Sequence, residues 1–554
     1  MKDALLVNDE DHTILRTNKR VRTLLCFVSI GLLISLANIA LVSVTFAVVN
    51  NRLKPSSNDN KLSLDSTYAE SIRIDEVMVH LRELQRLATA NNRTRAVNTY
   101  GFNQTLEYIT DYLSTNTNYR VRKSFFPVKN FALVRNPILL SSVDGIIKNH
   151  TYSTNLSVAE FVYVPYSTSF NIPDFVQLTA IPNYGCSDDD WLAASPTPTG
   201  HVALIQGGDC NFAEKSMVAA KYHPVALLFY NDATSPQPII FSLAQTNELP
   251  ALFLSYYLGQ TLANAARNPS MNASVHININ VMNNGTFPVG NICADTPTGD
   301  VTQTIVIGSH SDSVTAGPGI NDNGKLTYVC SGSAASLALA VTLARLFQTT
   351  NYAKYKYRIR FCWWGAEELG LLGSVYHVAQ AQNSSIVGER ITDYLINLNF
   401  DMLGSPNYMF GIYDGSTIDN ATTSRSAIPG SNRVSALFRD WFIRQKLPWD
   451  YTAFNGLSDY APFLTAGVVA GGLFSGADDF KTKEQRDRYD AILGQGQGGT
   501  ADASQDPCYH KACDSIQNIN VVGYEKMVQA AAYVIEFLAR QTDLKAWLYP
   551  STTI

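Results

Sequence analysis

Residues 357–370 read YRIRFCWWGAEELG, in which eight residues of strand type are followed by Gly-Ala and then by two adjacent glutamates. An apolar run of this length that is bounded by glycine predicts a buried strand. Strand-like patterns recur at 304–310 (TIVIGSH) and 394–404 (YLINLNFDMLG), and helical patterns lie at 331–347 (SGSAASLALAVTLARLF) and 520–541 (NVVGYEKMVQAAAYVIEFLARQ). Alternation over roughly 250 residues is typical of α/β proteins. We therefore predict that residues 286–541 form a three-layer α/β/α domain with a mixed, largely parallel sheet.

The pattern changes twice before this domain. Short strand-like runs such as HVALIQ and PVALLFYN occupy residues 131–285 and predict a separate, mainly β domain with some helix. Residues 66–130 carry apolar residues at three- and four-residue steps, as in VMVHLRELQRLA, and predict helices. Residues 50–65 are polar, with proline and serine, which is typical of a linker, and residues 542–554 form a C-terminal tail.

Composition excludes two broad classes of protein. The 554 residues are 46% hydrophobic and 16% charged, so the chain can bury a large core and is not mainly disordered. The formal net charge is −5, and the sequence has no basic domain or basic stripe. Nucleic-acid binding normally needs such a stripe, so we predict no nucleic-acid partner.

An uncharged stretch near the N-terminus predicts a membrane anchor. Residues 24–49 contain 26 consecutive residues without a charge, which is long enough to cross a bilayer as a helix. A cleaved signal peptide is the alternative, but its apolar region is shorter and follows a shorter basic segment. Lys and Arg are more frequent before the span than after it, so we expect residues 1–23 to be cytosolic. The chain is therefore predicted to be a single-pass type II membrane protein with its remainder luminal or extracellular, at a vacuole-like membrane or the cell surface.

The glycosylation triplets Asn-x-Ser/Thr agree with this orientation. They lie only beyond the span, at Asn92, Asn103, Asn149, Asn155, Asn272, Asn284, Asn383 and Asn420. Each triplet alone is weak support, because such triplets are common by chance. Together they predict a glycoprotein.

Cysteine usage points to the same oxidising compartment. Cys508 and Cys513 lie five residues apart, and Cys186 and Cys210 bracket one 24-residue stretch, so we predict two disulfides. Zinc binding by the first pair is the alternative, but the chain has no second close cysteine pair to complete such a site. Cys293, Cys330 and Cys362 have no obvious partners, and Cys362 is expected to be a small buried apolar residue.

Ionisable residues gather where the predicted strands of the α/β domain end. In an open parallel sheet, ligands bind outside the carboxyl ends of the strands. Histidine and carboxylate side chains together can hold divalent cations such as zinc, and a carboxylate can bridge two metal ions. The candidates are His310 and Asp312 after one strand, Asp322 in the loop GPGINDNG, Glu367 and Glu368 after the next strand, Asp401 after a third, and Tyr509 and His510 in PCYHKACD.

Each of these residues also has an ordinary structural explanation. A histidine at a strand end is often a hydrogen-bonded structural residue, and an aspartate in a glycine-rich loop is often a turn residue or helix cap. Acidic or histidine residues at several strand ends of one sheet are harder to explain by turn formation. We therefore predict a metal site.

The order of these motifs carries a resemblance to a known family. H-S-D, G-I-N-D-N-G, W-G-A-E-E-L-G-L-L-G-S, N-F-D-M-L-G and Y-H-x-x-C-D together resemble peptidase family M28, the dizinc metallopeptidases, and within it aminopeptidases of the aminopeptidase S and aminopeptidase Y type. The stretch SDYAPF at 458–463 fits the same resemblance. Residues 131–285 resemble a protease-associated (PA) domain, with Cys186 and Cys210 at its usual disulfide positions.

The resemblance implies an enzyme and assigns roles to its residues. Two zinc ions would be bridged by Asp322, with His310 and Asp401 completing one site and Glu368 and His510 the other. Glu367 would be the general base, Asp312 would orient His310, and Tyr509 would stabilise the oxyanion. The implied activity is a membrane-anchored metallo-aminopeptidase that removes N-terminal, mainly apolar residues from peptides.

The chain departs from the family pattern at one place. Residues 325–330 (KLTYVC) separate GINDNG from SGSAA, and their removal would restore the family's continuous motif. They are either a genuine insertion or a splice or gene-model artefact. Two other functions stay open: a glutamate-carboxypeptidase-like enzyme, although only 44 residues follow His510, and a non-catalytic receptor-like relative impaired by the insertion.

Overall fold

The computed structural model describes residues 66–550, with gaps at 209, 211, 232, 234–235, 240–242, 244–248, 314–330, 419–422 and 510–512. Within the described residues, eight strands form one mixed sheet in the order β1-β11-β13-β12-β14-β17-β15-β16. Their bounds are β1 (Arg120–Leu133), β11 (Val281–Asp295), β12 (Asp300–His310), β13 (Tyr357–Trp364), β14 (Tyr394–Phe400), β15 (Gly411–Asp414), β16 (Asp450–Ala453) and β17 (Val469–Phe474). The central strands β13, β12, β14 and β17 run parallel, and antiparallel pairs flank them, so the prediction of a mixed sheet is confirmed.

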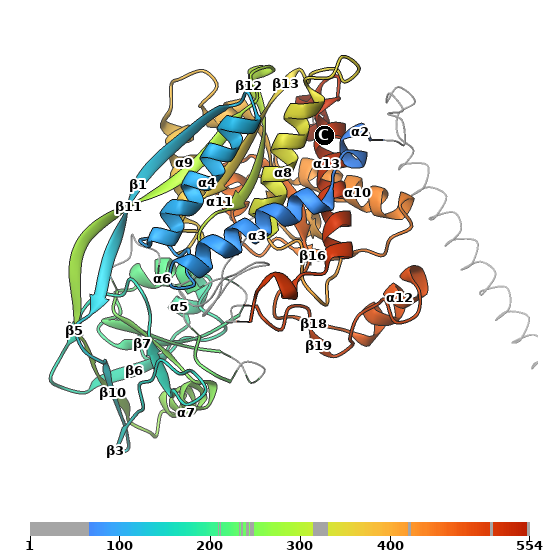
Figure 1. Cartoon of the computed structure of the whole chain (residues 1–554). Coiled ribbons are helices and arrows are strands. Elements are labelled where there is room, and N and C mark those ends of the chain that lie inside the picture. The colour runs from blue at the N-terminus through green and yellow to red at the C-terminus, as the bar shows by residue number, and fades with distance from the viewer. Residues whose placement is uncertain are drawn as a thin grey trace, which may run out of the picture. The chain divides into compact units, whose positions relative to one another are not determined.

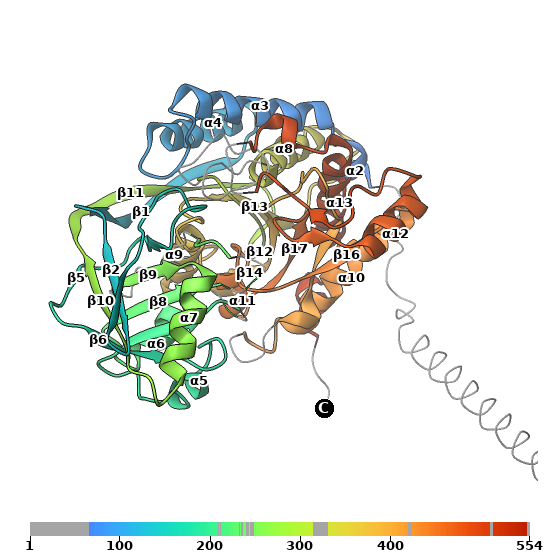
Figure 2. The same cartoon turned by 90° about the horizontal axis from the view of Figure 1, so that it is seen from below.

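Helices cover both faces of this sheet (Figures 1 and 2). Alternate residues of β12 explain how: Ile305 and Ile307 belong to the larger apolar core, and Val306 belongs to a smaller core on the opposite face. The larger core includes α3 (Ile74–Ala90), α4 (Tyr100–Asn116), α8 (Ser331–Leu346), α10 (Ile428–Arg444) and α13 (Val521–Ala539). The smaller core includes residues of α9 (Leu372–Asn383) and α11 (Ala461–Thr465). Strands β13 and β14 are buried along their whole length, and this burial includes the polar side chains of Arg358, Arg360, Asn397 and Asn399.

The expectation of helix throughout residues 66–130 is correct only as far as Asn116. Helices span α2 (Thr67–Glu70), α3 and α4, but Arg120–Leu133 forms β1 at the border of the sheet. Most residues of β1 are partly or fully exposed, so it lacks a clear alternation of apolar and polar residues. Its pairing with β11 therefore leaves little trace in the sequence pattern.

A second sheet of nine strands, again counted within the described residues, occupies most of the chain between β1 and β11. Its main order is β3-β2-β10-β6-β7-β8-β9-β4, and β5 pairs with β10. The strands are β2 (Ile138–Val143), β3 (Ile146–Asn149), β4 (Phe161–Tyr163), β5 (Phe170–Asn171), β6 (Val176–Ala180), β7 (Val202–Gln206), β8 (Ala226–Tyr230), β9 (Ala251–Leu254) and β10 (Ala273–Ile279), with helices α5 (Asp188–Leu192), α6 (Phe212–Ala220) and α7 (Tyr256–Arg267). Cys186 bonds to Cys210 here, as predicted.

Strands β1 and β11 pair with each other over almost their whole length. The antiparallel register runs from Arg120 opposite Asp295 to Leu133 opposite Val281, with one irregularity between Lys129 and Phe131. The chain therefore leaves the eight-stranded sheet and returns to it along two neighbouring strands.

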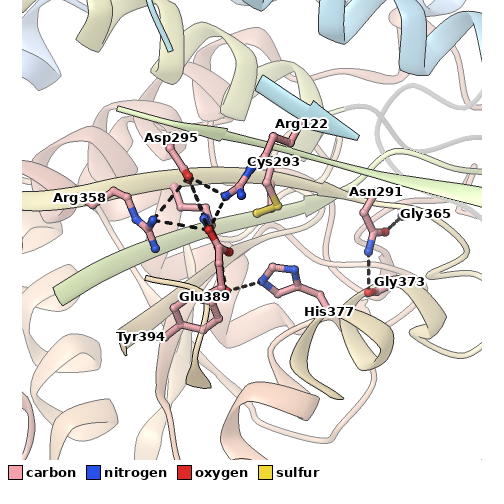
Figure 3. The surroundings of a disulfide bond; sticks show 12 residues. Arg122, Asn291, Cys293, Asp295, Arg358, Gly365, Gly373, His377, Glu389 and Tyr394 are labelled. Carbon is pink, nitrogen blue, oxygen red and sulfur yellow. Dashed lines mark hydrogen bonds and ion pairs between the residues drawn. A yellow bond between two sulfur atoms is a disulfide. The ribbon is translucent and has the colours of Figure 1, made fainter. Parts of the chain in front are cut away.

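A disulfide that the cysteine spacing did not indicate joins Cys293 of β11 to Cys362 of β13. The two residues are direct cross-strand partners, and their Cα atoms lie 4.2 Å apart. Figure 3 shows the surroundings of this bond. The interpretation of Cys362 as an unbonded apolar residue was therefore wrong, because a separation of 69 residues in sequence gives no indication of a register that brings two strands face to face.

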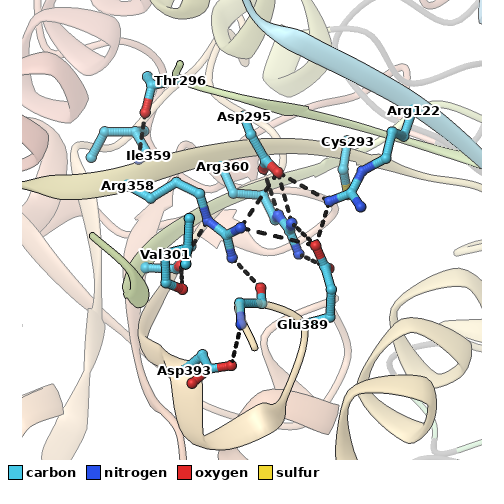
Figure 4. A network of polar contacts seen from close by, with 12 residues as sticks. Arg122, Cys293, Asp295, Thr296, Val301, Arg358, Ile359, Arg360, Glu389 and Asp393 are labelled. Atoms are coloured by element: carbon cyan, nitrogen blue, oxygen red, sulfur yellow. Dashed lines mark hydrogen bonds and ion pairs between the residues drawn. The ribbon is translucent and has the colours of Figure 1, made fainter. Parts of the chain in front are cut away.

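Charged side chains cluster next to this disulfide on the same face of the sheet (Figure 4). Asp295 accepts hydrogen bonds from Arg360 at 2.6 and 2.8 Å, and Glu389 contacts both Arg360 and Arg122. Burial alone would raise the pKa of Glu389, but bonds to Arg360 and Arg122 outweigh it and lower the pKa to about 2. The cluster ties β1, β11 and β13 to the segment that precedes β14.

The predicted membrane span at 24–49, with the tail 1–23 and the linker 50–65, lies outside the described residues. In the part of the chain that the structure does describe, no helix combines the length and the apolar character needed to cross a bilayer.

Candidate metal centre

Three neighbouring parallel strands bring several predicted site residues together at the carboxyl-terminal end of the eight-stranded sheet. Strand β12 ends at His310, β13 ends at Trp364 shortly before Glu367, and β14 ends immediately before Asp401. Because β12 lies between β13 and β14 and runs parallel to both, their carboxyl ends meet. Residues that are far apart in sequence thus converge at one place.

His310 lies at the centre of this group. Its Nε2 atom is 3.3 Å from Asp401 Oδ1, and its Nδ1 atom is 3.8 Å from Glu367 Oε2. Ligand atoms of His310, Glu367 and Glu368 lie within 4.8 Å of one another. Asp312 Oδ1 lies 3.7 Å from His310 Nδ1, which is longer than a hydrogen bond.

The site is buried, and its charges perturb one another. Burial alone would lower the pKa of His310, but the carboxylates of Glu367 and Asp401 raise it well above its ordinary value. Burial also raises the pKa of Glu367 well above the usual range, although His310 opposes this shift. Buried ionisable groups that perturb one another in this way are typical of functional sites.

The donor set fits a divalent metal ion. His310 supplies an imidazole nitrogen, and Glu368 and Asp401 supply carboxylate oxygens, which are ligands that zinc accepts. Asp312 Oδ1 accepts the Glu367 N–H at 3.1 Å, while its buried Oδ2 atom has no hydrogen-bond partner among the residues described.

Two residues whose roles were not anticipated hold Asp401 in place. Ser458 Oγ donates to Asp401 Oδ2 at 2.6 Å, and Asn399 Nδ2 donates to Ser458 Oγ at 2.8 Å. All three side chains are buried. Ser458 lies in the motif SDYAPF, whose order along the chain indicated the family but not this contact.

The residue after Ser458 belongs to a neighbouring contact. Asp459 Oδ1 lies 2.5 Å from Ser374 Oγ, at the start of α9. Burial raises the pKa of Asp459 to about 7. This contact joins the loop after β16 to the helix that follows Glu367 and Glu368.

The segment that carries Glu367 and Glu368 is fixed at both ends by one side chain. Asn291 Oδ1 accepts the Gly365 N–H at 2.9 Å, and Asn291 Nδ2 donates to the Gly373 carbonyl at 2.8 Å (Figure 3). Between them, Ala366 and Leu371 adopt left-handed backbone conformations, with φ of 59° and 60°. These conformations are costly for residues with a Cβ, so the surrounding bonds must maintain them.

The start of α8 is also fixed to the strands of the site. Ser333 Oγ donates to the His310 carbonyl, and Ser331 Oγ accepts the N–H of Leu403 at 3.0 Å. Gly332 packs against β14 so closely that a Cβ there would lie 2.1 Å from the Phe400 carbonyl oxygen. The motif SGSAA therefore keeps a defined place even though KLTYVC precedes it.

Several predicted site features lie outside the described residues: Asp322, His510 and the departure at 325–330. Tyr509 is half-buried, and its N–H donates to the Asp506 carbonyl at 3.1 Å. Cys508 bonds to Cys513, as predicted, so a disulfide closes the loop that contains His510.

Two known families match separate parts of the chain. The pattern of Peptidase family M28 matches residues 291–535, and that of the PA domain matches residues 174–262. These matches cover the strands of the site and the central part of the second sheet.

Curated relatives match most of the chain. An aminopeptidase of Pseudomonas aeruginosa is 31% identical over 480 residues, which are 85% of this chain and 82% of the relative. Leucine aminopeptidase 2 of Trichophyton rubrum is 31% identical over 470 residues, 85% of each chain. A probable leucine aminopeptidase 2 of Aspergillus fumigatus is 35% identical over 382 residues, 68% of this chain and 69% of the relative.

Solved structures share the fold. An aminopeptidase from Aneurinibacillus sp. strain AM-1 aligns over 84% of this chain and 94% of its own, with a TM-score of 0.58 and 19% identity. BSAP, a zinc aminopeptidase from Bacillus subtilis, aligns over 84% and 95%, with a TM-score of 0.51 and 18% identity.

Proposed function

This chain belongs to peptidase family M28 and is a metallo-aminopeptidase, and we propose that it removes N-terminal apolar residues from peptides with the help of two zinc ions. The observation that carries the proposal is the convergence of His310, Glu367, Glu368 and Asp401 at the carboxyl-terminal end of the sheet. The preference for apolar residues is supported by relatives named leucine aminopeptidase 2.

We assign the zinc ligands residue by residue from the family pattern. His310 and Asp401 would hold one ion, Glu368 and His510 the other, and Asp322 would bridge the two. The described ligands support this assignment, because His310, Glu368 and Asp401 come from three adjacent strand ends and offer both imidazole and carboxylate donors. Ser458 would keep the Asp401 carboxylate oriented toward the ion through its 2.6 Å bond.

When bound, the two ions would lower the pKa of a water molecule and polarise the scissile carbonyl group. Glu367 would accept a proton from the attacking water and return it to the leaving amine, for which a raised pKa is suitable. Tyr509 would donate a hydrogen bond to the carbonyl oxygen as it gains negative charge. Asp312, beside the His310 ring, would favour the ring orientation that presents Nε2 to the metal.

The disulfides support an extracellular or luminal location for the described part of the chain. We propose that residues 24–49 anchor the protein in the membrane as a type II signal-anchor, with the enzyme on the luminal or extracellular side. The residues from 131 to 285 would act as a PA domain that controls access of long peptides. If so, their removal would alter selectivity among long peptides but not among dipeptide-like substrates.

The test compares two neighbouring glutamates in the full-length protein purified in detergent. Zinc is measured by elemental analysis, and activity by hydrolysis of leucyl-p-nitroanilide. We expect about two zinc ions per chain, and activity that a chelator abolishes. Glu367→Gln should remove activity but retain zinc, because it loses the base, and Glu368→Gln should lose zinc as well as activity.

Other results would redirect the proposal. Zinc loss in both variants would contradict the distinction between base and ligand, and full activity in Glu367→Gln would contradict its role as the base. If the wild-type chain holds no zinc, deletion of residues 325–330 should restore zinc and activity. Absence of both after that deletion would favour the non-catalytic relative.

A further inference from the structure

One glycosylation triplet lies at an unusual place in the second sheet. All described asparagines of these triplets are exposed: Asn92, Asn103, Asn149, Asn155, Asn272, Asn284 and Asn383. Asn149 differs from the others in its surroundings because it is the last residue of β3, which is an edge strand of the nine-stranded sheet (Figure 1). Exposed edge strands can pair with a strand of another molecule, and proteins usually protect them against such pairing.

Two residues of β3 have backbone N–H and C=O groups that point away from β2. His150 donates its N–H to the Leu139 carbonyl at 3.0 Å, and Leu140 is the register partner of Asn149. Because N–H and C=O groups alternate in direction along a strand, the groups of Asn149 and Ile147 point away from β2. Within the described residues, β2 is the sole partner strand of β3. A further strand could therefore pair with Ile147 and Asn149.

The side chains around Asn149 give this edge strand and its neighbour β2 an apolar exposed face. Ile147 shares the outer face with Asn149 and is 60% exposed, and Ile138 of β2 is 41% exposed. Leu140, directly opposite Asn149, is partly exposed on the same face. The opposite face is the buried one, because Leu139 is 0% exposed and belongs to the core of this sheet. Lys148 is the one charged residue in β3.

We propose that Asn149 carries an N-linked oligosaccharide that covers the unpaired edge of strand β3 and its apolar exposed face. In the transfer, the Asn149 side-chain nitrogen would form a bond to the anomeric carbon of a lipid-diphosphate-linked oligosaccharide. The nitrogen would lose a proton, and the lipid diphosphate would leave. The attached glycan is bulky and solvated, so it would exclude a second copy of the chain from the edge strand.

The test uses two substitutions at Thr151, the third residue of the triplet. Thr151 is exposed, and its side chain is not part of the core. Thr151→Ala destroys the triplet without changing Asn149, and Thr151→Ser preserves the triplet, so it is the matched control. The full-length chains are produced in a eukaryotic host and purified in detergent. Peptide mass mapping measures occupancy of Asn149, and light scattering measures the molar mass of the protein.

We expect a glycan at Asn149 in the wild type and in Thr151→Ser, and none in Thr151→Ala. The unglycosylated variant should associate, with at least a twofold rise in molar mass at concentrations where Thr151→Ser stays at the wild-type mass. Adding Ile147→Lys to Thr151→Ala should reverse the association, because a charge on the edge strand opposes pairing. Hydrolysis of leucyl-p-nitroanilide should be equal in all chains, which verifies folding.

An unmodified Asn149 in the wild type would overturn the proposal. So would equal molar mass in Thr151→Ala and Thr151→Ser, or association that Ile147→Lys does not reverse. If Thr151→Ala fails to fold, the folded wild type can instead be treated with an endoglycosidase that leaves one sugar. An unchanged molar mass after this treatment would equally contradict a protective role.

Discussion

Asn291 donates its side-chain amide to the carbonyl oxygen of Gly373 at 2.8 Å. The same side chain accepts the N–H of Gly365, so one residue of β11 joins both ends of the segment that contains Glu367 and Glu368. Gly373 leaves no room for a larger residue, because a Cβ there would lie 2.4 Å from Asn291 Oδ1. The position of the two glutamates thus depends on a strand that contributes no predicted ligand.

Asn291→Ala should lower kcat more than it changes KM. The substitution leaves the Gly365 N–H and the Gly373 carbonyl without their partner, which costs about 1–3 kcal/mol of stability. A small displacement of Glu367 should lower kcat by about 10- to 100-fold. Steady-state kinetics and urea unfolding measure both effects. The control is Asn397→Ala, since Asn397 is buried in β14 without a hydrogen-bond partner among the described residues. Equal kcat in the two variants would contradict a positioning role for Asn291.

Ser458→Ala should weaken zinc binding. The hydroxyl donates to Asp401 Oδ2 at 2.6 Å, and loss of such a supporting bond typically costs about 10- to 100-fold in metal affinity. Titration with a competing chelator measures the affinity. Ser435→Ala is the control, because Ser435 is buried and bonds to the Tyr413 carbonyl instead. A chelator midpoint that is the same in both variants would count against this role of Ser458.

Removal of the Cys293–Cys362 disulfide should destabilise the protein without removing activity. The bond closes a loop of 69 residues, and the chain-entropy relation gives about 4 kcal/mol for a loop of that length. The double variant Cys293→Ala/Cys362→Ala is compared with Cys186→Ala/Cys210→Ala, whose shorter loop predicts a smaller loss of about 3 kcal/mol. Urea unfolding measures both. A loss below about 1 kcal/mol for the longer loop would refute the estimate.

Stability should fall between about pH 6.5 and pH 4 because of His80. Burial lowers the pKa of His80 to about 4, and its Nδ1 atom lies 2.7 Å from the Tyr108 hydroxyl. The unfolded chain, with a histidine pKa of about 6.5, binds the proton more readily in this range, so acidification favours unfolding. The full contribution is present above about pH 6.5, and about 3 kcal/mol is lost by the time the pH is below both values.

His80→Gln keeps a hydrogen-bonding group but cannot be protonated in this range. Its unfolding free energy should therefore depend less steeply on pH than that of the wild type. Chemical denaturation at a series of pH values from 7 to 4 provides the comparison. Parallel curves for the two proteins would show that His80 does not cause the acid sensitivity.

The sequence predicted the parts of the site that lie at strand ends. His310, Glu367 and Asp401 each lie at or just after the end of a strand-like run, and neighbouring parallel strands bring such ends together. The supporting contacts of Ser458 and Asn291 were not predictable in this way. Both depend on pairs of residues more than 50 positions apart, and no local pattern encodes which side chain will face which backbone group.

Strand register explains the remaining differences. The Cys293–Cys362 bond needs the two cysteines to face each other across β11 and β13, and spacing in sequence carries no such information. Strand β1 escaped prediction because its exposed residues lack regular alternation. Helical periodicity, in contrast, correctly indicated α3 and α4, whose buried residues recur at three- and four-residue steps.

The pairing of Leu133 with Val281 has a consequence for how this protein could have arisen. The chain departs from β1 and rejoins β11 at adjacent points, so a short turn could connect the two strands directly. Addition or loss of the intervening 147 residues, 134–280, would leave the strand order of the eight-stranded sheet intact. A single recombination event at one hairpin could thus have given an ancestral enzyme its second sheet, with no need to redesign the catalytic fold.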